Sequence, residues 1–397
     1  MTKPLSLSSS DTKRDIAQSD DCRQSRGISV ERLVLGRRRM FLSPIYIVLL
    51  ACVSDTHQIE KSSSELFRVR RASDSKWGYI DKTGKVIIEP QFDSARDFSE
   101  GLAWAGKGGK YFFINGVGKI VIDSHEKLGN PTYDFVGDFT KGGIARVKVN
   151  DDFGNDVGYI DKMGRLVIRM KVEPNGNVTA IYPVNSASRS LSSDVSMEES
   201  LLSLKVNNKY GYYDINGREI IRPQFDIAYR FSEGLARVEL GGKYGYIDKT
   251  GQIIIPPQFD YAENFSEGLA VVGIDDKYGY IDKKGKIVIT LQYKWGLQFV
   301  EGLAPVHIKR GEKAGYINQS GAMVITPKFD LVGSFSEDLA PVSVNNLWGY
   351  IDKAGKIVIE PRFDYASSFS KGIARIEIDN KFGYIDKAGS YIWKPGS

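Results

Sequence analysis

Residue types that commonly perform catalysis or bind metals are sparse and scattered in this chain. Its three histidines, His57, His125 and His307, follow no spacing that a metal site uses. The Gly-x-Ser-x-Gly motif of a serine nucleophile and the Walker-type loop of nucleotide-binding proteins are missing from the sequence. Carboxylates are numerous, which leaves acid–base hydrolysis by Asp or Glu as the catalytic alternative. The sequence itself predicts no catalytic residue, no cofactor and no metal site.

One of the two cysteines stands where a lipid could be attached. Arg37-Arg38-Arg39 precedes an apolar run from Met40 to Ala51, which ends at Cys52. This order is typical of an export signal, and the run is too short to span a bilayer comfortably. Leu49-Leu50-Ala51-Cys52 resembles a bacterial lipobox, which implies cleavage before Cys52 and lipidation of that cysteine. The alternative is a buried hydrophobic strand with a chance cysteine.

The export pattern divides the chain into four parts. Residues 1–36 form a polar extension that is either disordered or not translated, with a true start near Val34. Residues 37–52 are the expected signal peptide with its lipobox, and Arg38-Arg39 also resembles a twin-arginine export motif. Residues 53–65, rich in Ser and charges, are the expected tether, and residues 66–397 form the folded domain.

The folded domain is built from repeats of one short motif. Lys76-Trp77-Gly78-Tyr79-Ile80-Asp81-Lys82-Thr83-Gly84 recurs nine times, and five of the eight intervals between copies are 34 residues. Self-similarity at this period indicates stacked copies of one supersecondary unit. Most of the recurring residues are therefore expected to build the unit rather than to do chemistry.

Each copy predicts a hairpin. In the copy that contains Asp248-Lys249-Thr250-Gly251, an Asx residue begins a tight turn and a glycine ends it. The Asx side chain bonds its own backbone there, and glycine accepts a positive φ. The arms, Tyr244 to Ile247 and Gln252 to Ile255, are joined by a third strand at Gly268 to Val272. Each unit is then an antiparallel meander, with a short fourth strand possible in the linking segment.

The predicted fold class is all-β, with tandem repeats of three- to four-stranded antiparallel meanders. The hairpin arms are apolar on both faces, so neighbouring copies must cover each other. The Trp/Tyr row of the motif is therefore expected between sheets, and the alternative is an aromatic ladder that faces a ligand. Blade-like meanders favour a β-propeller-like arrangement, with an open superhelical β-repeat array as the alternative.

The motif Lys76 to Lys85, followed by Pro90-Gln91-Phe92-Asp93 and Phe98 to Ala103, resembles the bacterial WG-repeat family, also called KWG repeats. The resemblance covers residues 66–397. It implies β repeats, often on exported or lipid-anchored bacterial proteins, and no agreed biochemical activity. The second copy departs from the pattern at Phe112-Phe113, and the third copy lacks the Pro-x-Phe-Asp segment.

Charge excludes one class of partner. The net charge is +5, but residues 1–39 hold nine Lys/Arg against five Asp/Glu, so about one positive charge remains for the rest of the chain. A near-neutral repeat region has no electrostatic footprint for nucleic acid. We therefore expect no nucleic-acid partner.

The irregular second and third copies are the expected place for recognition. Insertions lie near residues 123–131, 150–156 and 170–196. Loops on a rigid scaffold often carry binding residues, although such insertions are also tolerated as decoration. The candidate ligand surface there comprises Trp104, Tyr133 and Phe153. Trp104 alternates away from the apolar Ala103 and Ala105, and its alternative role is packing beneath an insertion.

The leading functional hypothesis is a non-enzymatic, lipid-anchored scaffold of the bacterial cell envelope that binds protein or cell-envelope polysaccharide. Its membrane contact would be the lipid on Cys52. One alternative is a hydrolase that uses carboxylates of the second and third copies. Another is a cytosolic protein-interaction module, and a periplasmic or secreted location also remains open.

Overall fold

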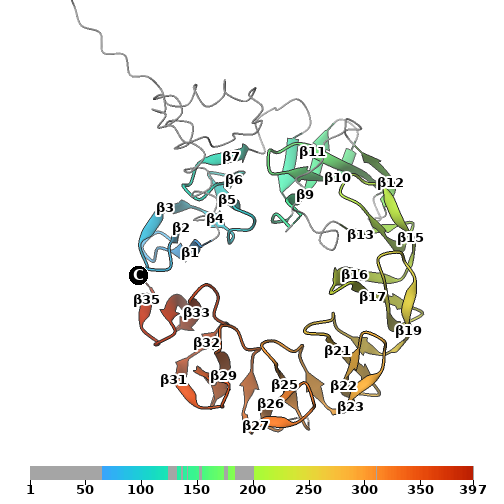
Figure 1. Cartoon of the computed structure of the whole chain (residues 1–397). Coiled ribbons are helices and arrows are strands. Elements are labelled where there is room, and N and C mark those ends of the chain that lie inside the picture. Colours follow the sequence, from blue (N-terminus) through green and yellow to red (C-terminus); the bar gives the residue numbers. More distant parts are fainter. Residues whose placement is uncertain are drawn as a thin grey trace, which may run out of the picture. The chain divides into compact units, whose positions relative to one another are not determined.

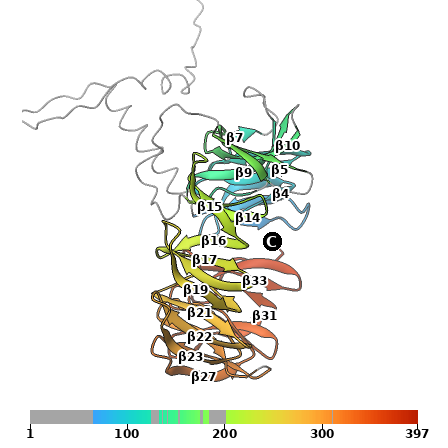
Figure 2. The same ribbon diagram turned by 90° about the vertical axis from the view of Figure 1, so that its right-hand side faces the viewer.

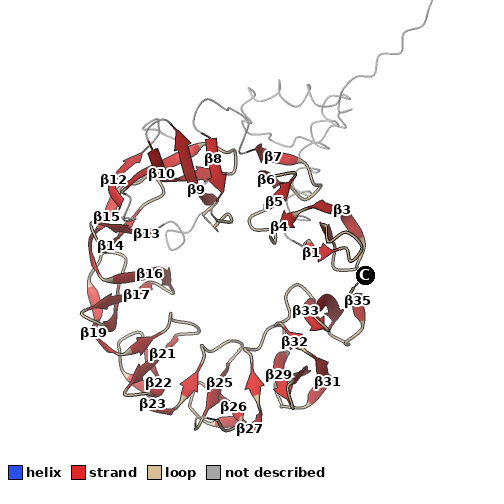
Figure 3. Cartoon of the chain, turned by 180° about the vertical axis from the view of Figure 1, so that it is seen from behind, coloured by secondary structure: helices blue, strands red, loops and turns tan. Residues whose placement is uncertain are grey.

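The computed structural model describes residues 65–123, 132–135, 137–140, 142–151, 154–173, 178–183, 201–309 and 311–396. The chain divides into two compact units, Met1–Glu60 and Lys61–Ser397, and all of the described residues belong to the second. Every regular element among them is a β-strand (Figure 3). No helix within these ranges is long and apolar enough to cross a membrane. Cys52 and the expected export signal lie outside the described residues.

The strands vary in length from two to eight residues. In chain order they are β1 (Phe67–Arg70), β2 (Trp77–Ile80), β3 (Val86–Phe92), β4 (Ser94–Ala95), β5 (Ala103–Lys107), β6 (Lys110–Ile114), β7 (Ile120–Asp123), β8 (Thr132–Phe135), β9 (Ile144–Asp151), β10 (Gly154–Asp161), β11 (Leu166–Val172), β12 (Val178–Pro183), β13 (Leu202–Val206), β14 (Lys209–Tyr213), β15 (Glu219–Phe225), β16 (Ile227–Ser232), β17 (Leu235–Leu240), β18 (Lys243–Ile247), β19 (Ile253–Phe259), β20 (Tyr261–Ala262), β21 (Leu269–Ile274), β22 (Lys277–Asp282), β23 (Ile287–Tyr293), β24 (Trp295–Gly296), β25 (Leu303–His307), β26 (Ala314–Asn318), β27 (Met323–Phe329), β28 (Leu331–Val332), β29 (Ala340–Val344), β30 (Leu347–Ile351), β31 (Ile357–Phe363), β32 (Tyr365–Ala366), β33 (Ile373–Ile378), β34 (Lys381–Asp386) and β35 (Tyr391–Trp393).

The regular unit is a four-stranded antiparallel meander. Sheets β4–β7, β16–β19, β20–β23, β24–β27, β28–β31 and β32–β35 each have the strands in chain order, and the first sheet, β1–β3, lacks the short leading strand. In Figure 1 the leading strands, such as β16 and β32, lie toward the inside and the last strands, such as β19 and β35, toward the outside. The prediction of an all-β fold made of three- to four-stranded meanders is confirmed.

The turn inside each hairpin forms as its sequence predicts. Asp248 Oδ1 accepts hydrogen bonds from the backbone N–H groups of Thr250 and Gln252, at 2.9 and 3.0 Å. The N–H of Gly251 donates to the carbonyl of Asp248, and Gly251 has a φ of 87°. A positive φ of this size favours glycine, which explains the glycine at the end of every copy of the turn.

The glycine of the Trp-Gly or Tyr-Gly pair is required by a bulge in the adjoining strand. In β18 and β19, Tyr244 pairs with Phe259 and Tyr246 with Ile255, so the step of two residues along β18 is matched by four along β19. A Cβ on Gly245 would lie 2.5 Å from the carbonyl oxygen of Ile255. The bulge therefore brings the backbone of β19 so close to position 245 that only the hydrogen atom of a glycine fits there.

The tyrosine that follows this glycine anchors each sheet to the next one. Tyr246 is completely buried, packs at a tilt against Phe265 with 4.8 Å between ring centroids, and donates a 2.6 Å hydrogen bond to the carbonyl of Glu263. The same bond, to a carbonyl 17 residues onward, recurs at five more tyrosines: Tyr79, Tyr212, Tyr280, Tyr316 and Tyr350. A buried hydroxyl needs such a partner, and the regular spacing of the repeat supplies one.

The hydrophobic core is divided among the interfaces between sheets. Tyr246 and Ile255 of one sheet, for example, pack with Ala262, Ala270 and other residues of the next. Figure 2, at right angles to Figure 1, shows consecutive sheets such as β16–β19 and β20–β23 side by side. Each sheet thus covers its neighbour, as apolar residues on both faces require.

The first and last sheets also pack together. Val69 and Ile80 of the first sheet form one buried cluster with Ile373 and Tyr384 of the last. Trp77 stacks on Phe382 at 5.5 Å between centroids, with 14° between the planes. Each sheet has two free edges, and the first and last sheets pack face to face without sharing a strand. The row is therefore β-propeller-like, which confirms that prediction over the superhelical array.

Glutamates in the Ser-Glu-Gly turns and their relatives form a second set of links between sheets. The carboxylate of Glu301 accepts the backbone N–H groups of Glu337 and Asp338, at 2.6 and 3.0 Å, and pairs with Lys353 at 3.0 Å. Glu233 holds Gly268 and Lys283 in the same way, at 3.0 and 3.1 Å. These repeated carboxylates are therefore occupied in joining units.

The third and fourth copies share one eight-stranded sheet, β8–β15. The joint is β12, which comes from the expected insertion at 170–196 and pairs antiparallel with β11. A single parallel bridge between Val178 and Val206 then connects β12 to β13. Nine sequence copies consequently give eight sheets within the described residues.

Candidate functional site

The sequence-predicted ligand surface is described only at Trp104. This side chain is partly buried, stacks on Tyr111 at 5.1 Å between centroids, and lies beneath the guanidinium of Arg96 at 5.2 Å. It also packs against the cluster that joins sheet β4–β7 to the next sheet. Tyr133 belongs to β8, but its side chain lies outside the description, as do Phe153 and the lipidation candidate Cys52. The ligand surface of Trp104, Tyr133 and Phe153 therefore stays a prediction, as does lipidation at Cys52.

The described carboxylates offer no cluster that could hold a metal ion. No group of three or more His, Cys, Asp or Glu side chains within the described ranges could hold a metal ion. Most repeated carboxylates instead have fixed partners. Asp226, for example, pairs with Lys209 at 2.5 Å and accepts the N–H of Gly241 at 2.8 Å. The hydrogen bond from Lys209, followed by that from Gly241, lowers the pKa of Asp226. Such a carboxylate is a poor general acid at neutral pH.

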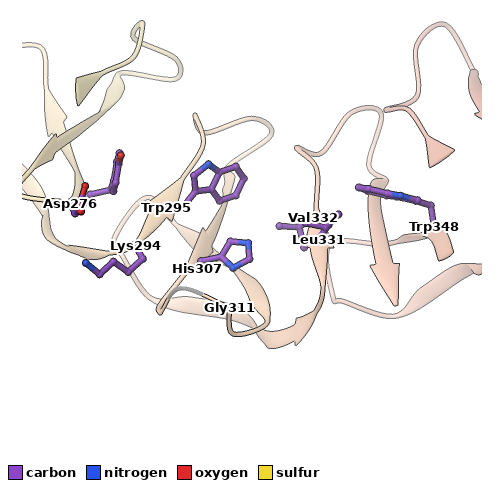
Figure 4. Close-up of a pocket in the computed structure, with 9 residues that line it drawn as sticks. Asp276, Lys294, Trp295, His307, Gly311, Leu331, Val332 and Trp348 are labelled. Carbon is purple, nitrogen blue, oxygen red and sulfur yellow. The ribbon is translucent and has the colours of Figure 1, made fainter. Parts of the chain in front are cut away.

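A pocket of about 610 Å³ lies where three successive sheets meet (Figure 4). We call it the sheet-junction pocket. Its lining residues come from β20–β23 and the turn after it, from β24–β27, and from β28–β31: Asp276, Tyr278, Lys294, Trp295, His307, Gly311, Leu331, Val332 and Trp348. It combines two tryptophans with a small number of polar groups, which is the usual character of a small-molecule site.

The pocket lies beside a missing aromatic ring. The motif places Trp or Tyr before its glycine in most copies, such as Tyr244, Tyr278 and Trp348, whereas the seventh copy has Ala314. At regular junctions this ring packs against the following sheet, as Trp348 does against Tyr365 at 6.2 Å. A ring at position 314 would face Leu331 and Val332, and both of these line the pocket. Ala314 itself is completely buried in the cluster between these two sheets and is not part of the lining.

A charge reversal accompanies this substitution. Five other copies carry Asp at the position of Lys294: Asp93, Asp226, Asp260, Asp330 and Asp364. Asp260 pairs with Lys243, 17 residues earlier, and its second oxygen accepts the N–H of Asp275 at 3.1 Å. Lys294 is 17 residues after Lys277, so two cations replace the ion pair. Neither lysine forms an ion pair within the part of the chain that the structure describes.

The turn beside Lys294 is longer than its counterparts. Six residues separate the paired His307 and Ala314, whereas four separate the equivalent Gly273 and Tyr278. The aspartate that caps the shorter turn elsewhere is absent here because Lys294 occupies its place. In the longer turn, His307 Nδ1 lies 3.1 Å from the carbonyl oxygen of Glu312. This contact holds the imidazole against the pocket.

Two tryptophans give the pocket its apolar surfaces. Trp295 begins the short leading strand β24, is 36% exposed, and lies edge-on to His307 at 5.3 Å between ring centroids. Trp348 lies across the pocket on β30, beyond Leu331 and Val332 (Figure 4). The Trp/Tyr row thus has two roles. The tyrosine after the glycine is core, and the ring before it is partly exposed.

The sequence contains three signals for this pocket. They are the single interval of 36 residues between copies, the alanine at 314, and the lysine at 294. Each is a departure from the repeat, and the three positions lie close together only after the strands have paired into sheets. The larger insertions, which drew the sequence prediction to the second and third copies, do not point to this site.

Comparison with a family model gives the classification. The model described as "WG containing repeat" matches residues 77–111, 130–151, 210–244, 244–278, 278–308, 315–348 and 348–382, more than half of the chain. The chain belongs to the WG-repeat family. The matches to the WG repeat stop at residue 308 and resume at residue 315, so the longer turn of the sheet-junction pocket falls in the gap. No curated protein sequence matches this WG-repeat chain.

Solved structures resemble this WG-repeat protein in fold. A crystal structure of a eukaryotic initiation factor has a TM-score of 0.54 at 14% identity, covering 82% of this chain and 94% of that one. The dihydro-heme d1 dehydrogenase NirN in complex with DHE has a TM-score of 0.39 at 13% identity, covering 75% and 72%. A streptogramin B lyase has a TM-score of 0.32 at 13% identity, covering 73% and 91%. At these identities the likeness concerns the fold alone.

Proposed function

We propose that this WG-repeat protein is a non-enzymatic binding scaffold and that the sheet-junction pocket is its recognition site. The observation that carries the proposal is the coincidence of two departures from the repeat, Lys294 and the longer turn after His307, in one pocket, with a third, the buried Ala314, in the adjoining core. A rigid array whose regular side chains are occupied in packing has its irregular positions available for recognition.

The absence of enzymatic activity is part of the proposal. It is supported by the partners of the carboxylates, because Glu233, Glu301 and Asp226 all bond to lysine and to backbone N–H groups. Removal of the Glu233 or Glu301 side chain would break hydrogen bonds and ion pairs that join adjacent units. A hydrolase would instead need a carboxylate pair with separate acid and base roles.

We further propose that the protein is lipid-anchored in the bacterial cell envelope and that its ligand is a protein or a cell-envelope polysaccharide. The support for anchoring is the order of basic run, apolar run and Cys52 in the sequence. Labelling cells with a palmitate analogue tests it, with wild type compared with Cys52→Ala. Label that persists in Cys52→Ala would contradict lipidation at this cysteine and favour a different attachment site, whereas wild type without label would favour a cytosolic protein.

The binding function itself is tested with the full chain. Purified protein is applied to a glycan array and, separately, used to capture envelope proteins, in each case beside Ala314→Tyr. We expect binding to at least one ligand that Ala314→Tyr weakens, because the tyrosine restores the ring that regular junctions contain. Failure to bind any glycan or protein would contradict the proposal, and so would binding that Ala314→Tyr leaves unchanged.

A further inference from the structure

We infer that the sheet-junction pocket binds a sugar unit that carries a carboxylate, as in an acidic polysaccharide. This inference rests on the binding function proposed above and adds the chemical class of the ligand. It draws on three properties of the pocket: its aromatic walls, its charge balance, and the hydrogen-bonding direction of its polar groups.

The aromatic walls fit the C–H face of a sugar ring. Trp295 and Trp348 line the pocket from two different sheets, and Trp295 is 36% exposed. The face of an indole ring is electron-rich and attracts the weakly positive C–H groups of a pyranose. Leu331 and Val332 lie between the two tryptophans and extend the apolar surface (Figure 4). The volume of about 610 Å³ lies within the range of small-ligand sites.

The charge balance favours an acid with one negative charge. Lys294 lines the pocket, and Lys277 stands where its counterpart Lys243 reaches the aspartate of its own copy. Asp276 is the one carboxylate among the described residues of the lining. Within the lining Lys294 balances Asp276, and Lys277, which lies between the lining residues Asp276 and Tyr278 in the chain and forms no ion pair among the described residues, adds a further positive charge. A single carboxylate on the ligand would take the place that the aspartate occupies in the regular copies.

The remaining polar side chains of the lining include two acceptors, beside the hydroxyl of Tyr278, which can both donate and accept. The carbonyl of Glu312 can only accept, so His307 Nδ1 donates to it across 3.1 Å, and the tautomer with its proton on Nδ1 has Nε2 as an acceptor. Asp276 is a second acceptor in the lining. Acceptors beside aromatic walls suit the hydroxyl donors of a sugar. They suit a fatty acid or an aromatic acid less, because neither has hydroxyl groups to satisfy both acceptors.

The test measures binding of two matched probes by calorimetry. A tetramer of galacturonic acid is compared with the neutral tetramer of galactose, using the full chain. Wild type is expected to bind the acidic tetramer about tenfold more tightly than the neutral one, because a charge-assisted hydrogen bond is at stake. Equal affinity for both tetramers would overturn the assignment of a carboxylate.

Three variants locate the site. Lys294→Asp restores the residue of the regular copies and is expected to weaken binding of the acidic tetramer about tenfold or more, because it reverses the charge. Trp295→Ala removes one wall and should weaken both tetramers. Tyr391→Ala is the control, since Tyr391 is an aromatic residue at the start of β35, is 41% exposed and is not part of the lining. Thermal melting of each variant checks the fold.

The outcomes separate this inference from the proposed function. Loss of acidic binding in Lys294→Asp and Trp295→Ala, with Tyr391→Ala unchanged, supports the inference. If no acidic sugar binds, but another ligand does and Ala314→Tyr weakens it, the recognition site stands and the ligand class is wrong. If acidic sugar binds and both pocket variants bind as wild type does, the pocket is not the site.

Discussion

The hydroxyl of Tyr384 donates a 2.9 Å hydrogen bond to the carbonyl oxygen of Arg68, 316 residues earlier in the chain. In other copies the equivalent tyrosine donates to a carbonyl 17 residues later, as Tyr350 does to Ser367. Among the described residues no unit follows the last copy, and the first sheet lacks the short leading strand that would supply the usual acceptor. The backbone of β1 therefore takes that role, and the last sheet bonds to the first as any sheet bonds to its successor.

Removing this hydroxyl tests the contact between the ends. Tyr384→Phe is expected to lower the free energy of unfolding by about 1 kcal/mol, the usual net value of a buried hydrogen bond. It should also speed amide hydrogen exchange in β1 and β2, because that bond helps to hold the first sheet against the last. Tyr350→Phe is the control, with a similar loss of stability but no selective effect on β1. Equal exchange in both variants would contradict a role in holding the ends together.

The glycine of the motif gives a second prediction. Gly245→Ala should lower the free energy of unfolding by more than about 3 kcal/mol, because the Cβ of alanine would lie 2.5 Å from the carbonyl oxygen of Ile255. Only a shift of the backbone could relieve this contact. Gly273→Ala is the matched control. Its Cβ would lie 3.2 Å from side-chain atoms of Tyr261 and Tyr278, which can shift, so about 1 kcal/mol is expected. Urea unfolding measures both, and similar losses would show that the bulge does not dictate the glycine.

Much of this fold follows from the repeat. The turn at Asp248, the meander and the burial of Tyr246 are each dictated by a few residues that recur, so local chemistry suffices to predict them. Packing of neighbouring copies follows because both faces of the hairpin are apolar. The eight-stranded sheet was not predictable in this way. It depends on β12, which has no counterpart in the repeat, and on one bridge between Val178 and Val206.

The pocket was hidden from sequence reasoning for a related reason. An insertion is visible in the sequence, whereas a cavity arises where a side chain is too small for its surroundings. Ala314 is an ordinary residue by itself, and its effect depends on which sheet it faces. Lys294 is 20 residues away along the chain and becomes relevant because the strand that follows it, β24, pairs with β25. Only the three-dimensional register unites these substitutions.

The buried tyrosines predict how stability responds to alkali. Burial raises the pKa of Tyr316 above its ordinary value, and burial followed by the charge of Asp97 raises the pKa of Tyr384 to about 12. A pKa that is higher in the folded state means that ionisation favours unfolding. The stabilising contribution of these tyrosines is thus complete below about pH 10, the pKa in the unfolded chain, and is lost as the pH rises through the folded values. A tenfold difference between the acid dissociation constants of a tyrosine in the folded and unfolded states corresponds to about 1.4 kcal/mol in the free energy of unfolding.

Urea midpoints measured from about pH 8 to pH 11 check this dependence. The midpoint should fall above about pH 10, and Tyr316→Phe should reduce the fall because one ionising group is removed. Tyr391→Phe is the control, because Tyr391 is 41% exposed. A midpoint that stays constant to pH 11, or a fall that Tyr391→Phe reduces as much as Tyr316→Phe does, would contradict the prediction.

The glutamate links between sheets give the last prediction. Glu301 has a φ of 54°, which costs about 1 kcal/mol for a residue with a side chain, and its carboxylate compensates by bonding Glu337, Asp338 and Lys353. Glu301→Gln keeps the size but loses the charge and one acceptor, so the free energy of unfolding should fall by about 1 to 2 kcal/mol. Lys353→Met removes the ion pairs of this lysine with Glu301 and Asp338 and leaves the backbone hydrogen bonds of Glu301 in place. If the backbone hydrogen bonds contribute most of the stability, Lys353→Met should lower the free energy of unfolding less than Glu301→Gln does, because a solvent-exposed ion pair contributes little. Equal losses of the free energy of unfolding, measured by chemical unfolding, would show that the ion pair is the main contact instead.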